Sequence, residues 1–404
     1  MKTMERVKFK IYPSEIQEKT LMKNCNNARY AYNWGVAKIR NALANKADVP
    51  SAYTLSKEFN KYKKLPENSW LIEEGTSQRA TKMAFCKQLK MAMQKFTKEK
   101  KRPPSFKTKK SGEKMSYYTH EKTTKYLLDS IRIENVGYVK CKHNLPIFDQ
   151  CVKIVDPIIL WNGDYFEMAV TLKYLTPKKP KYHYSENNER ASVIGIDVGI
   201  THQITTSDGY VYDVPNISKL EKRIKRLDRK IAKNRKLYGI AYETKTKSFE
   251  CIPKTQNFKK LEAKRRKLYR KSANIRKDAR CKAISDIFSR YPKAIVIENI
   301  KNPRSWRIKG ATNYNHKIQN ACIGDVLERI KYKAKWLDVP LYIADETYPS
   351  SQICSNCGNR DNNKFSRNRM FKCSRCGHIE DRDINAAKNL SNLANEISTK
   401  KFTF

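Results

Sequence analysis

The chain has 404 residues, of which 39% are hydrophobic, so it can bury a sizeable core, which excludes a wholly disordered protein. Its 84 Lys and Arg residues outnumber its 40 Asp and Glu residues, which gives a formal net charge of +44 at pH 7. Such a charge repels itself unless a polyanion neutralises it, which favours nucleic acid as the partner. No apolar run reaches the roughly 18 residues that a membrane span needs, and the N-terminus is not a signal peptide. We therefore expect a protein of the reducing cytosol, with no membrane partner.

The first 185 residues are predicted to form a small β-barrel into which helices are inserted. Residues 6–12 alternate apolar and basic side chains as a strand does, and Pro13 ends that strand. Further strands are expected between 116 and 175, and the isolated first strand needs them as partners. Residues 1–13 and 100–185 would then form the barrel, and residues 14–99 a helical insertion. Helices are predicted at 15–24, 29–45, 54–63 and 76–97.

Residues 98–114 form a basic break, in which Pro103, Pro104 and Gly112 exclude a regular helix. The segment is either a linker or a loop that grips phosphates, and the sequence favours neither interpretation. The candidate nucleic-acid-binding residues are Phe106, as a stacking group, with Lys107 and Lys109.

The second half begins with an apolar strand, 191–199, that carries Asp197 near its end. Short strands follow at 202–206 and 210–214, joined by Asp208 and Gly209, a sequence typical of a type I′ hairpin. Three antiparallel strands led by an apolar strand that ends in Asp are typical of the start of a ribonuclease-H-like domain.

Residues 218–289 are predicted to be a basic helical hairpin, interrupted by a segment at 238–256 to which we assign no role. Apolar residues recur every three or four positions in its first arm, so the two arms should pair. The other faces are almost entirely Lys and Arg, which favours a nucleic-acid track over a merely solvated face. Beyond the hairpin we expect a strand at 294–298 that ends in Glu298, a helix at 317–337 and a strand at 341–345.

Two CxxC pairs, with fifteen residues between them, predict a zinc ribbon at residues 351–377. The four ligands would be Cys354, Cys357, Cys373 and Cys376. Four thiolates close a tetrahedral site, so we expect one structural zinc. Two disulfides are the alternative, which the cytosolic context and the scattered positions of the other seven cysteines disfavour. A helix from Asp383 to about residue 393 and a frayed tail, 398–404, complete the chain.

Three carboxylates stand at the end of an apolar strand or the start of a helix: Asp197, Glu298 and Asp383. Each alone could cap an element. Together they match a site for two divalent cations, because clustered carboxylates repel one another and need positive charge to stay ionised. Two Mg²⁺ or Mn²⁺ ions about 4 Å apart would supply that charge. The predicted reaction is phosphodiester hydrolysis by a nuclease.

These motifs together resemble the TnpB family, transposon-encoded proteins thought ancestral to the type V CRISPR effector nucleases. The similarity spans nearly the whole chain, and its C-terminal part is the more specific. The matching stretches are FKIYPS at 9–14, YNW at 32–34, PSFK at 104–107, GIDVG at 195–199, IEN at 297–299, SSQICSNCG at 350–358, the second CxxCG and DRDINAA at 381–387.

The resemblance implies an RNA-guided DNA endonuclease with an α/β multidomain fold. It implies a wedge-like N-terminal barrel, a helical recognition domain at 14–99, and a RuvC-like nuclease domain at 191–350 and 378–397. The family's catalytic acids map onto Asp197, Glu298 and Asp383. Its partners would be a guide RNA from the element's end and double- and single-stranded target DNA beside a short adjacent motif. A separate transposase of the same element is a further candidate partner, and the expected location is a prokaryotic nucleoid.

Two other functions remain open. Some relatives have lost a catalytic acid and act as repressors, so a nuclease-inactive nucleic-acid-binding protein is one alternative. It is disfavoured because all three acids are present. A DDE-type transposase is the other alternative, and it would be recognised by its strand-transfer products.

Overall fold

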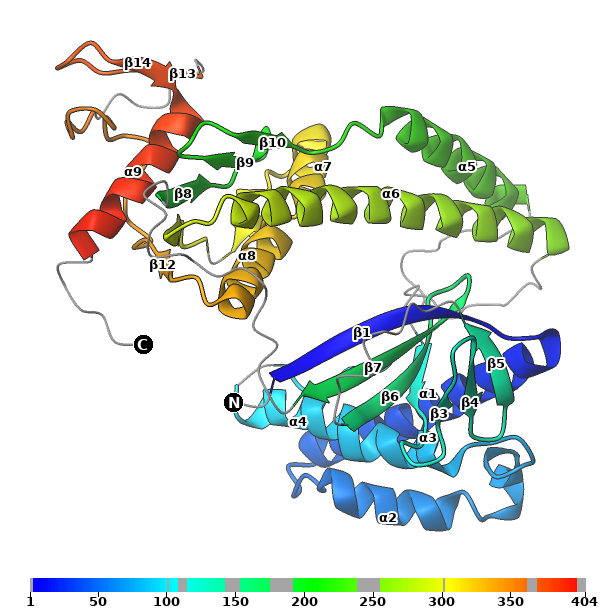
Figure 1. The fold of residues 1–404 in the computed structure, drawn as a ribbon. Coiled ribbons are helices and arrows are strands. Elements are labelled where there is room, and N and C mark those ends of the chain that lie inside the picture. Colours follow the sequence, from blue (N-terminus) through cyan, green and yellow to red (C-terminus); the bar gives the residue numbers. More distant parts are fainter. Residues whose placement is uncertain are drawn as a thin grey trace. The chain divides into compact units, whose positions relative to one another are not determined.

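The computed structural model describes residues 3–99, 102–107, 115–141, 153–174, 192–237, 255–300, 302–361 and 369–397. Lys109, residues 238–254 of the hairpin's interruption and the tail at 398–404 lie outside the described residues. The fold is mixed α/β, and the chain divides into two compact units, 1–178 and 179–404 (Figure 1).

The first unit is built on an antiparallel sheet of seven strands, in the order β2-β6-β7-β1-β5-β4-β3. The first strand pairs with β7 from Thr3↔Tyr174 to Ile11↔Phe166, and with β5 at its end. The prediction that this strand joins the later ones is confirmed. Pairing between β2 and β3, which would close a barrel, is not found among the described residues, so the sheet is seen open. The strands are β1 (Thr3–Tyr12), β2 (Met115–Tyr118), β3 (Lys125–Tyr126), β4 (Ser130–Ile133), β5 (Gly137–Cys141), β6 (Lys153–Trp161) and β7 (Phe166–Tyr174).

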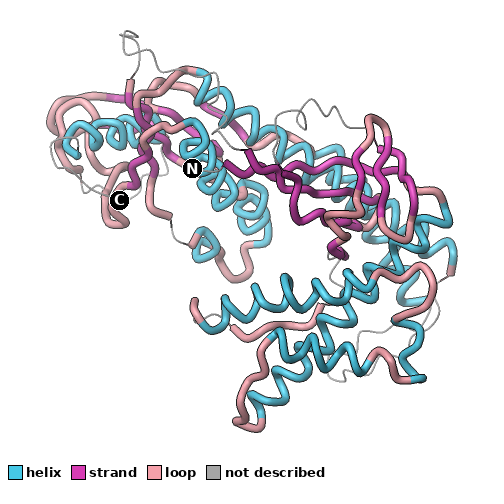
Figure 2. Tube along the Cα trace, turned by 60° about the horizontal axis from the view of Figure 1, so that its bottom comes forward, coloured by secondary structure: helices cyan, strands magenta, loops and turns pink. Residues whose placement is uncertain are grey.

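Helices cover one face of this sheet (Figure 2). The two helices predicted at 15–24 and 29–45 form one continuous helix, α1. The chain does not break there because the Asn24 side chain bonds the backbone of Gly75 and Ser77 rather than its own helix, while Cys25 and Ala28 are fully buried. The helices are α1 (Glu15–Ala44), α2 (Ala52–Tyr62), α3 (Gln78–Met83) and α4 (Lys90–Thr97), with a π-helical stretch, Ala84–Leu89, between the last two.

The second unit contains a five-stranded sheet in the order β10-β9-β8-β11-β12. The predicted trio of antiparallel strands is confirmed, and β11 runs parallel to both β8 and β12. The prediction of a type I′ turn is wrong. Such a turn needs a positive φ at both central residues, Asp208 and Gly209, and only Gly209 has one, at 88°. The strands are β8 (Val193–Asp197), β9 (His202–Thr206), β10 (Val211–Asp213), β11 (Ala294–Ile297) and β12 (Leu341–Ile343).

Helices pack on both faces of this second sheet, as buried parallel strands require. Ile295 and Ile297 of β11 face the core formed with α6 and α8, and Val296 faces α9. The single helix predicted at 317–337 is two helices, because Cys322 adopts a left-handed φ of 49° between them. The helices are α5 (Ser218–Leu237), α6 (Gln256–Ser289), α7 (Thr312–Ala321), α8 (Ile323–Leu337) and α9 (Arg382–Ile397).

Helix α9 lies unusually close to β8, and Gly195 makes this approach possible. A Cβ atom at Gly195 would lie 1.9 Å from the Ala387 carbonyl oxygen and 2.5 Å from the Ser391 nitrogen. Ala386 and Ala387 are buried in the same contact. Small residues on both elements therefore bring the start of α9 against the sheet.

We expect the substitution Gly195→Ala to destabilise the second unit by roughly 3 kcal/mol or more, because the added methyl group meets backbone atoms that cannot rotate away. Chemical denaturation followed by circular dichroism would measure the loss. Gly324→Ala is the matched control, since nothing lies within 4 Å of a Cβ there and alanine favours the helix. Equal stability of the two variants would contradict the prediction.

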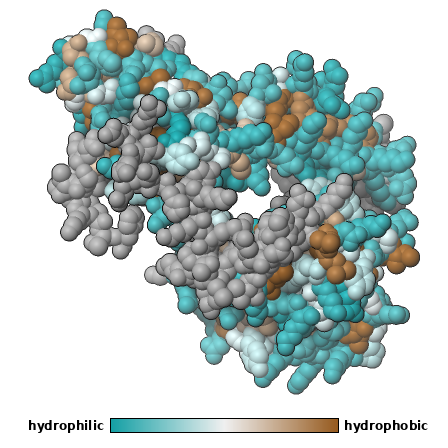
Figure 3. All heavy atoms as spheres, in the orientation of Figure 1, coloured by the Kyte–Doolittle hydropathy of each residue, from teal (hydrophilic) through white to brown (hydrophobic). Residues whose placement is uncertain are grey.

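No helix within the described ranges is long and apolar enough to cross a membrane. On the face drawn in Figure 3, the surface is mostly hydrophilic.

Candidate functional site

The three predicted acidic residues gather at one end of the second sheet. Asp197 is the last residue of β8, and Glu298 follows the last residue of β11 directly. These strands run parallel, with Ile196 opposite Ile297, so both carboxylates leave the sheet at the same edge. Asp383 lies in the first turn of α9, which packs on β8.

Charge repulsion and burial act together on Asp197. Burial removes water from its carboxyl group and raises the pKa well above the usual range, and the negative charges of Glu298 and Asp383 raise it further. Burial also raises the pKa of Glu298, while a hydrogen bond from Ser350 opposes that shift. The site therefore holds more negative charge than its surroundings compensate, which is the condition a bound cation would relieve.

Asp383 is held by two neighbours: Arg369, which the sequence did not indicate, and Asp381, whose position before the helix allowed a cap. Arg369 donates from Nη2 to Asp383 Oδ2 at 2.9 Å, and its Nε lies 3.9 Å from Asp381 Oδ2. Asp381 in turn caps α9, because its Oδ1 accepts hydrogen bonds from the backbone nitrogens of Asp383 and Ile384. The arginine partly neutralises this side of the site, and oxygen donors of this kind suit Mg²⁺ or Mn²⁺.

We expect Asp197→Asn to raise the unfolding temperature in the absence of Mg²⁺ and Mn²⁺ at pH 7. A carboxyl group whose folded pKa is raised favours folding fully below its unfolded pKa, and this contribution is lost as the pH rises through the folded value. The amide of Asn stays neutral at every pH, so the variant does not lose stability through ionisation at this position. The gain should therefore shrink as the pH falls towards about 4, the unfolded pKa of Asp.

Thermal unfolding at several pH values, in buffer free of Mg²⁺ and Mn²⁺ that leaves the structural zinc in place, measures this effect, and about 1 kcal/mol corresponds to roughly 2–4 °C for a unit of this size. A variant that is less stable than the native chain at pH 7 would show that Asp197 is satisfied without a cation.

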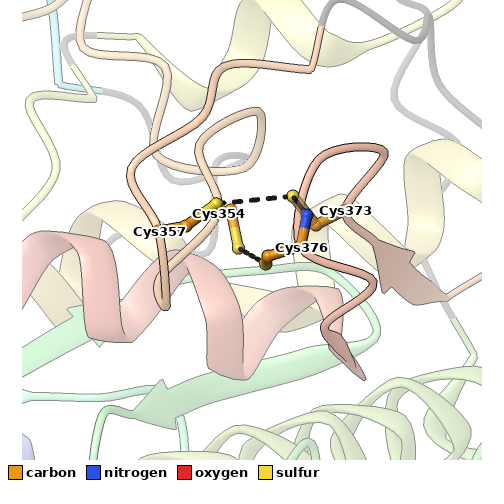
Figure 4. Close-up of side chains that lie close together, drawn as sticks. All are labelled: Cys354, Cys357, Cys373 and Cys376. Carbon is orange, nitrogen blue, oxygen red and sulfur yellow. Dashed lines mark hydrogen bonds between the residues drawn. The ribbon is translucent and has the colours of Figure 1, made fainter.

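The four predicted zinc ligands converge (Figure 4). Their sulfur atoms all lie within 4.8 Å of one another, with Cys354 and Cys376 3.7 Å apart and Cys357 and Cys373 3.6 Å apart. These separations exceed the length of about 2 Å of a disulfide bond. Within the described part of the chain, no other group of three or more His, Cys, Asp or Glu donors is gathered so tightly, so the three carboxylates lie further apart than these sulfurs.

The local backbone suits thiolates. Gly358 and Gly377 both have φ near +70° and donate their N–H groups to the carbonyls of Cys354 and Cys373, so each CxxC pair is followed by a tight turn, or knuckle. A backbone hydrogen bond from His378 is the largest cause that lowers the pKa of Cys376, to about 6. The cluster is consistent with one structural zinc ion. The strands β13 (Met370–Lys372) and β14 (Ile379–Asp381) flank the second knuckle.

Residues 102–107 are attached to α1. The Asn33 side chain bonds both the N–H and the carbonyl of Lys107, at 2.8 and 2.9 Å. The Lys107 ammonium group lies over the ring of Tyr32 at 4.0 Å. Phe106 is 45% exposed, with the Arg40 guanidinium 5.0 Å from its ring centre. This part of the basic break is thus no free linker, and nucleic-acid contacts of Phe106 and Lys107 stay predictions.

The basic hairpin pairs as predicted. Asp228 of α5 bonds Arg265 of α6 at 2.5 Å, and Glu221 bonds Arg276 at 2.8 Å, which fixes the antiparallel register. The apolar positions of α5 are buried between the helices: Leu220, Ile224, Leu227 and Ile231. The acidic residues Asp228 and Glu221 therefore form their ion pairs within the hairpin.

Two family models match parts of this chain. Residues 324–390 match the model described as a Cas12f1-like TNB domain, which covers α8, the cysteine cluster and the start of α9. Residues 1–47 match the IS605 OrfB model described as a helix-turn-helix domain. In this structure the second region forms β1 and the single helix α1.

Curated relatives match nearly the whole chain. The "Putative RNA-guided DNA endonuclease InsQ" of Escherichia coli (strain K12) is 23% identical over 96% of this chain and 92% of its own length. A "Putative RNA-guided DNA endonuclease" of Streptomyces pristinaespiralis is also 23% identical, over 95% of this chain and 87% of its own length. The cryo-EM structure of the Cas12f1-sgRNA-target DNA complex is similar with a TM-score of 0.54 at 12% identity, covering 97% of this chain and 99% of that one.

The fold is therefore that of a Cas12f-like mixed α/β protein. The resemblance seen in the motifs is confirmed: the first 47 residues match the IS605 OrfB model, nearly the whole chain is similar to proteins named as putative RNA-guided DNA endonucleases, and its fold is similar to that of Cas12f1.

Proposed function

We propose that this protein is an RNA-guided DNA endonuclease that hydrolyses phosphodiester bonds at Asp197, Glu298 and Asp383. The observation that carries the proposal is the gathering of these three acids at one sheet end, where burial, and after it the negative charges of Glu298 and Asp383, raise the pKa of Asp197. The relatives that match nearly the whole chain bear the name of such an enzyme, which supports the same activity here.

The three carboxylates would hold two Mg²⁺ or Mn²⁺ ions. When bound, such a pair activates the attacking water and stabilises the leaving oxygen of an in-line displacement. The chain's own residues prepare the site. Ser350 holds one oxygen of Glu298, and Arg369 holds one oxygen of Asp383. Parallel strands fix the spacing between Asp197 and Glu298.

The partners follow from the charge and the fold. A guide RNA would pair with target DNA, and base pairing would then carry the sequence specificity while the protein recognises mostly shape. The cationic faces of α5 and α6 suit a phosphate backbone. The wedge-like domain (1–13 and 100–185) and the helical domain (14–99) would hold the RNA and recognise the adjacent motif. Residues 191–350 and 378–397 would form the RuvC-like nuclease domain, with the zinc ribbon at 351–377 between them.

The first test is to express the protein together with its native flanking DNA and to sequence the nucleic acid that copurifies. We expect one dominant RNA, with a constant body and a 3′ end that runs into neighbouring sequence. Adding that RNA and Mg²⁺ should then give cleavage of matching DNA. Random host RNA, or none, would overturn guidance and leave an unguided nuclease or a transposase as the explanation of the acids.

A further inference from the structure

One loop contacts both the acidic site and the cysteine cluster. Ser350 lies in this loop and is almost fully buried, with 4% of its surface exposed. Its Oγ donates to Glu298 Oε1 at 2.6 Å, the short distance typical of a hydroxyl bound to an ionised carboxylate. A carboxylate held through one oxygen cannot rotate freely about its last bond, so this contact fixes how Glu298 presents its oxygens.

The backbone of the same loop is fixed by α9. Asn389 donates from Nδ2 to the carbonyl oxygens of Ser350 and Ile353, at 2.7 and 2.6 Å. Asn385, one turn earlier, donates to the Ile353 carbonyl at 2.7 Å and accepts from the Ser355 backbone nitrogen at 2.8 Å. Both asparagines are at most 2% exposed. Buried amides are stable only when paired, so the helix and the loop hold each other in place.

This arrangement links positions that are far apart in sequence. Helix α9 carries Asp383 at its start and the two asparagines further along. Cys354 lies between Ile353 and Ser355, the two residues that Asn385 bonds. One shared contact between the loop and α9 therefore positions Glu298, Asp383 and the first cysteine pair.

We propose that Ser350 is a positioning residue for Glu298, which it holds in the rotamer that accepts a divalent cation, and that Asn385 and Asn389 keep Ser350 in register with Asp383. The proposal rests on the proposed function of the acidic site. Residues that orient a metal ligand without touching the metal contribute 10–100-fold to metal affinity or activity in other sites. An effect of about that size is expected here.

The test uses the full-length protein with Ser350→Ala. Electron paramagnetic resonance of free Mn²⁺ measures metal binding without any nucleic acid, and we expect roughly 10–100-fold weaker binding. In single-turnover cleavage, the Mn²⁺ concentration for half-maximal rate should rise by a similar factor, while saturating Mn²⁺ restores the rate. Ser350→Thr keeps the hydroxyl group and should restore binding. Because its extra methyl group could disturb the buried site, rescue by excess metal is the second, independent readout.

Ser289→Ala is the matched control. It removes a hydroxyl group from the same unit, on α6, where Ser289 Oγ donates to the Asp286 carbonyl at 2.7 Å and takes no part in the loop-to-helix contact. Its Mn²⁺ binding should equal that of the native chain. Unchanged Mn²⁺ affinity in Ser350→Ala, with Asp197→Ala losing it, would overturn the positioning role alone. If Asp197→Ala also bound Mn²⁺ normally, the proposed function of the site would fail instead.

Discussion

Asp197→Ala is expected to abolish DNA cleavage while leaving guide RNA binding intact. The carboxylate lies at the end of a buried strand, beside Glu298 and Asp383, and is not part of the cationic hairpin that suits phosphates. Losing one group of a preorganised electrostatic site costs about 10²–10³-fold or more in rate. Single-turnover cleavage of target DNA with Mg²⁺ and the copurified RNA measures the loss.

Asp213→Ala is the matched control for this experiment. Asp213 also ends a strand of the same sheet, but its side chain is 65% exposed and pairs with His202 outside the site. It should cleave as the native chain does. If Asp197→Ala cleaved DNA normally, the acids would be structural and a nuclease-inactive binding protein would become the better explanation.

Cys354→Ser is expected to reduce bound zinc from one ion per chain to almost none. Cys354 is 1% exposed at the centre of the cluster, and a hydroxyl group is a poor replacement for a thiolate ligand. Apparent binding energies of structural zinc are on the order of 10 kcal/mol, so its loss should unfold the ribbon. Atomic absorption measures the zinc, and proteolysis between 351 and 377 reports the unfolding.

The contacts of Asn385 with the ribbon make a second consequence measurable. Because Asn385 bonds the residues on either side of Cys354, loss of the ribbon should also loosen the start of α9 in hydrogen exchange. Cys281→Ser is the control, since Cys281 is exposed on α6 and lies outside the cluster. Full zinc content in Cys354→Ser would show that three cysteines suffice.

The local sequence pattern was sufficient to predict the structure where the residues of a single element determine it. The alternation of residues 6–12 gave a strand, and the CxxC spacing gave a cluster of four sulfurs. It failed where distant contacts overrode local preference. Asn24 lies inside a continuous helix because its side chain bonds the backbone of Gly75 and Ser77. The predicted helix at 317–337 is divided at Cys322, which adopts a left-handed φ.

The sequence by itself determined which residues could form the site, because Asp and Glu stand out at the ends of apolar strands and paired cysteines carry their own spacing. Only the tertiary structure decided how that site is held. Arg369 and Ser350 are separated from their partners by 14 and 52 positions, and neither follows a periodic pattern. Their contacts exist because Gly195 lets α9 pack against β8 and because two buried asparagines bind the loop to that helix. Hydrogen-bond satisfaction in a buried site depends on the folded chain as a whole, which local sequence does not encode.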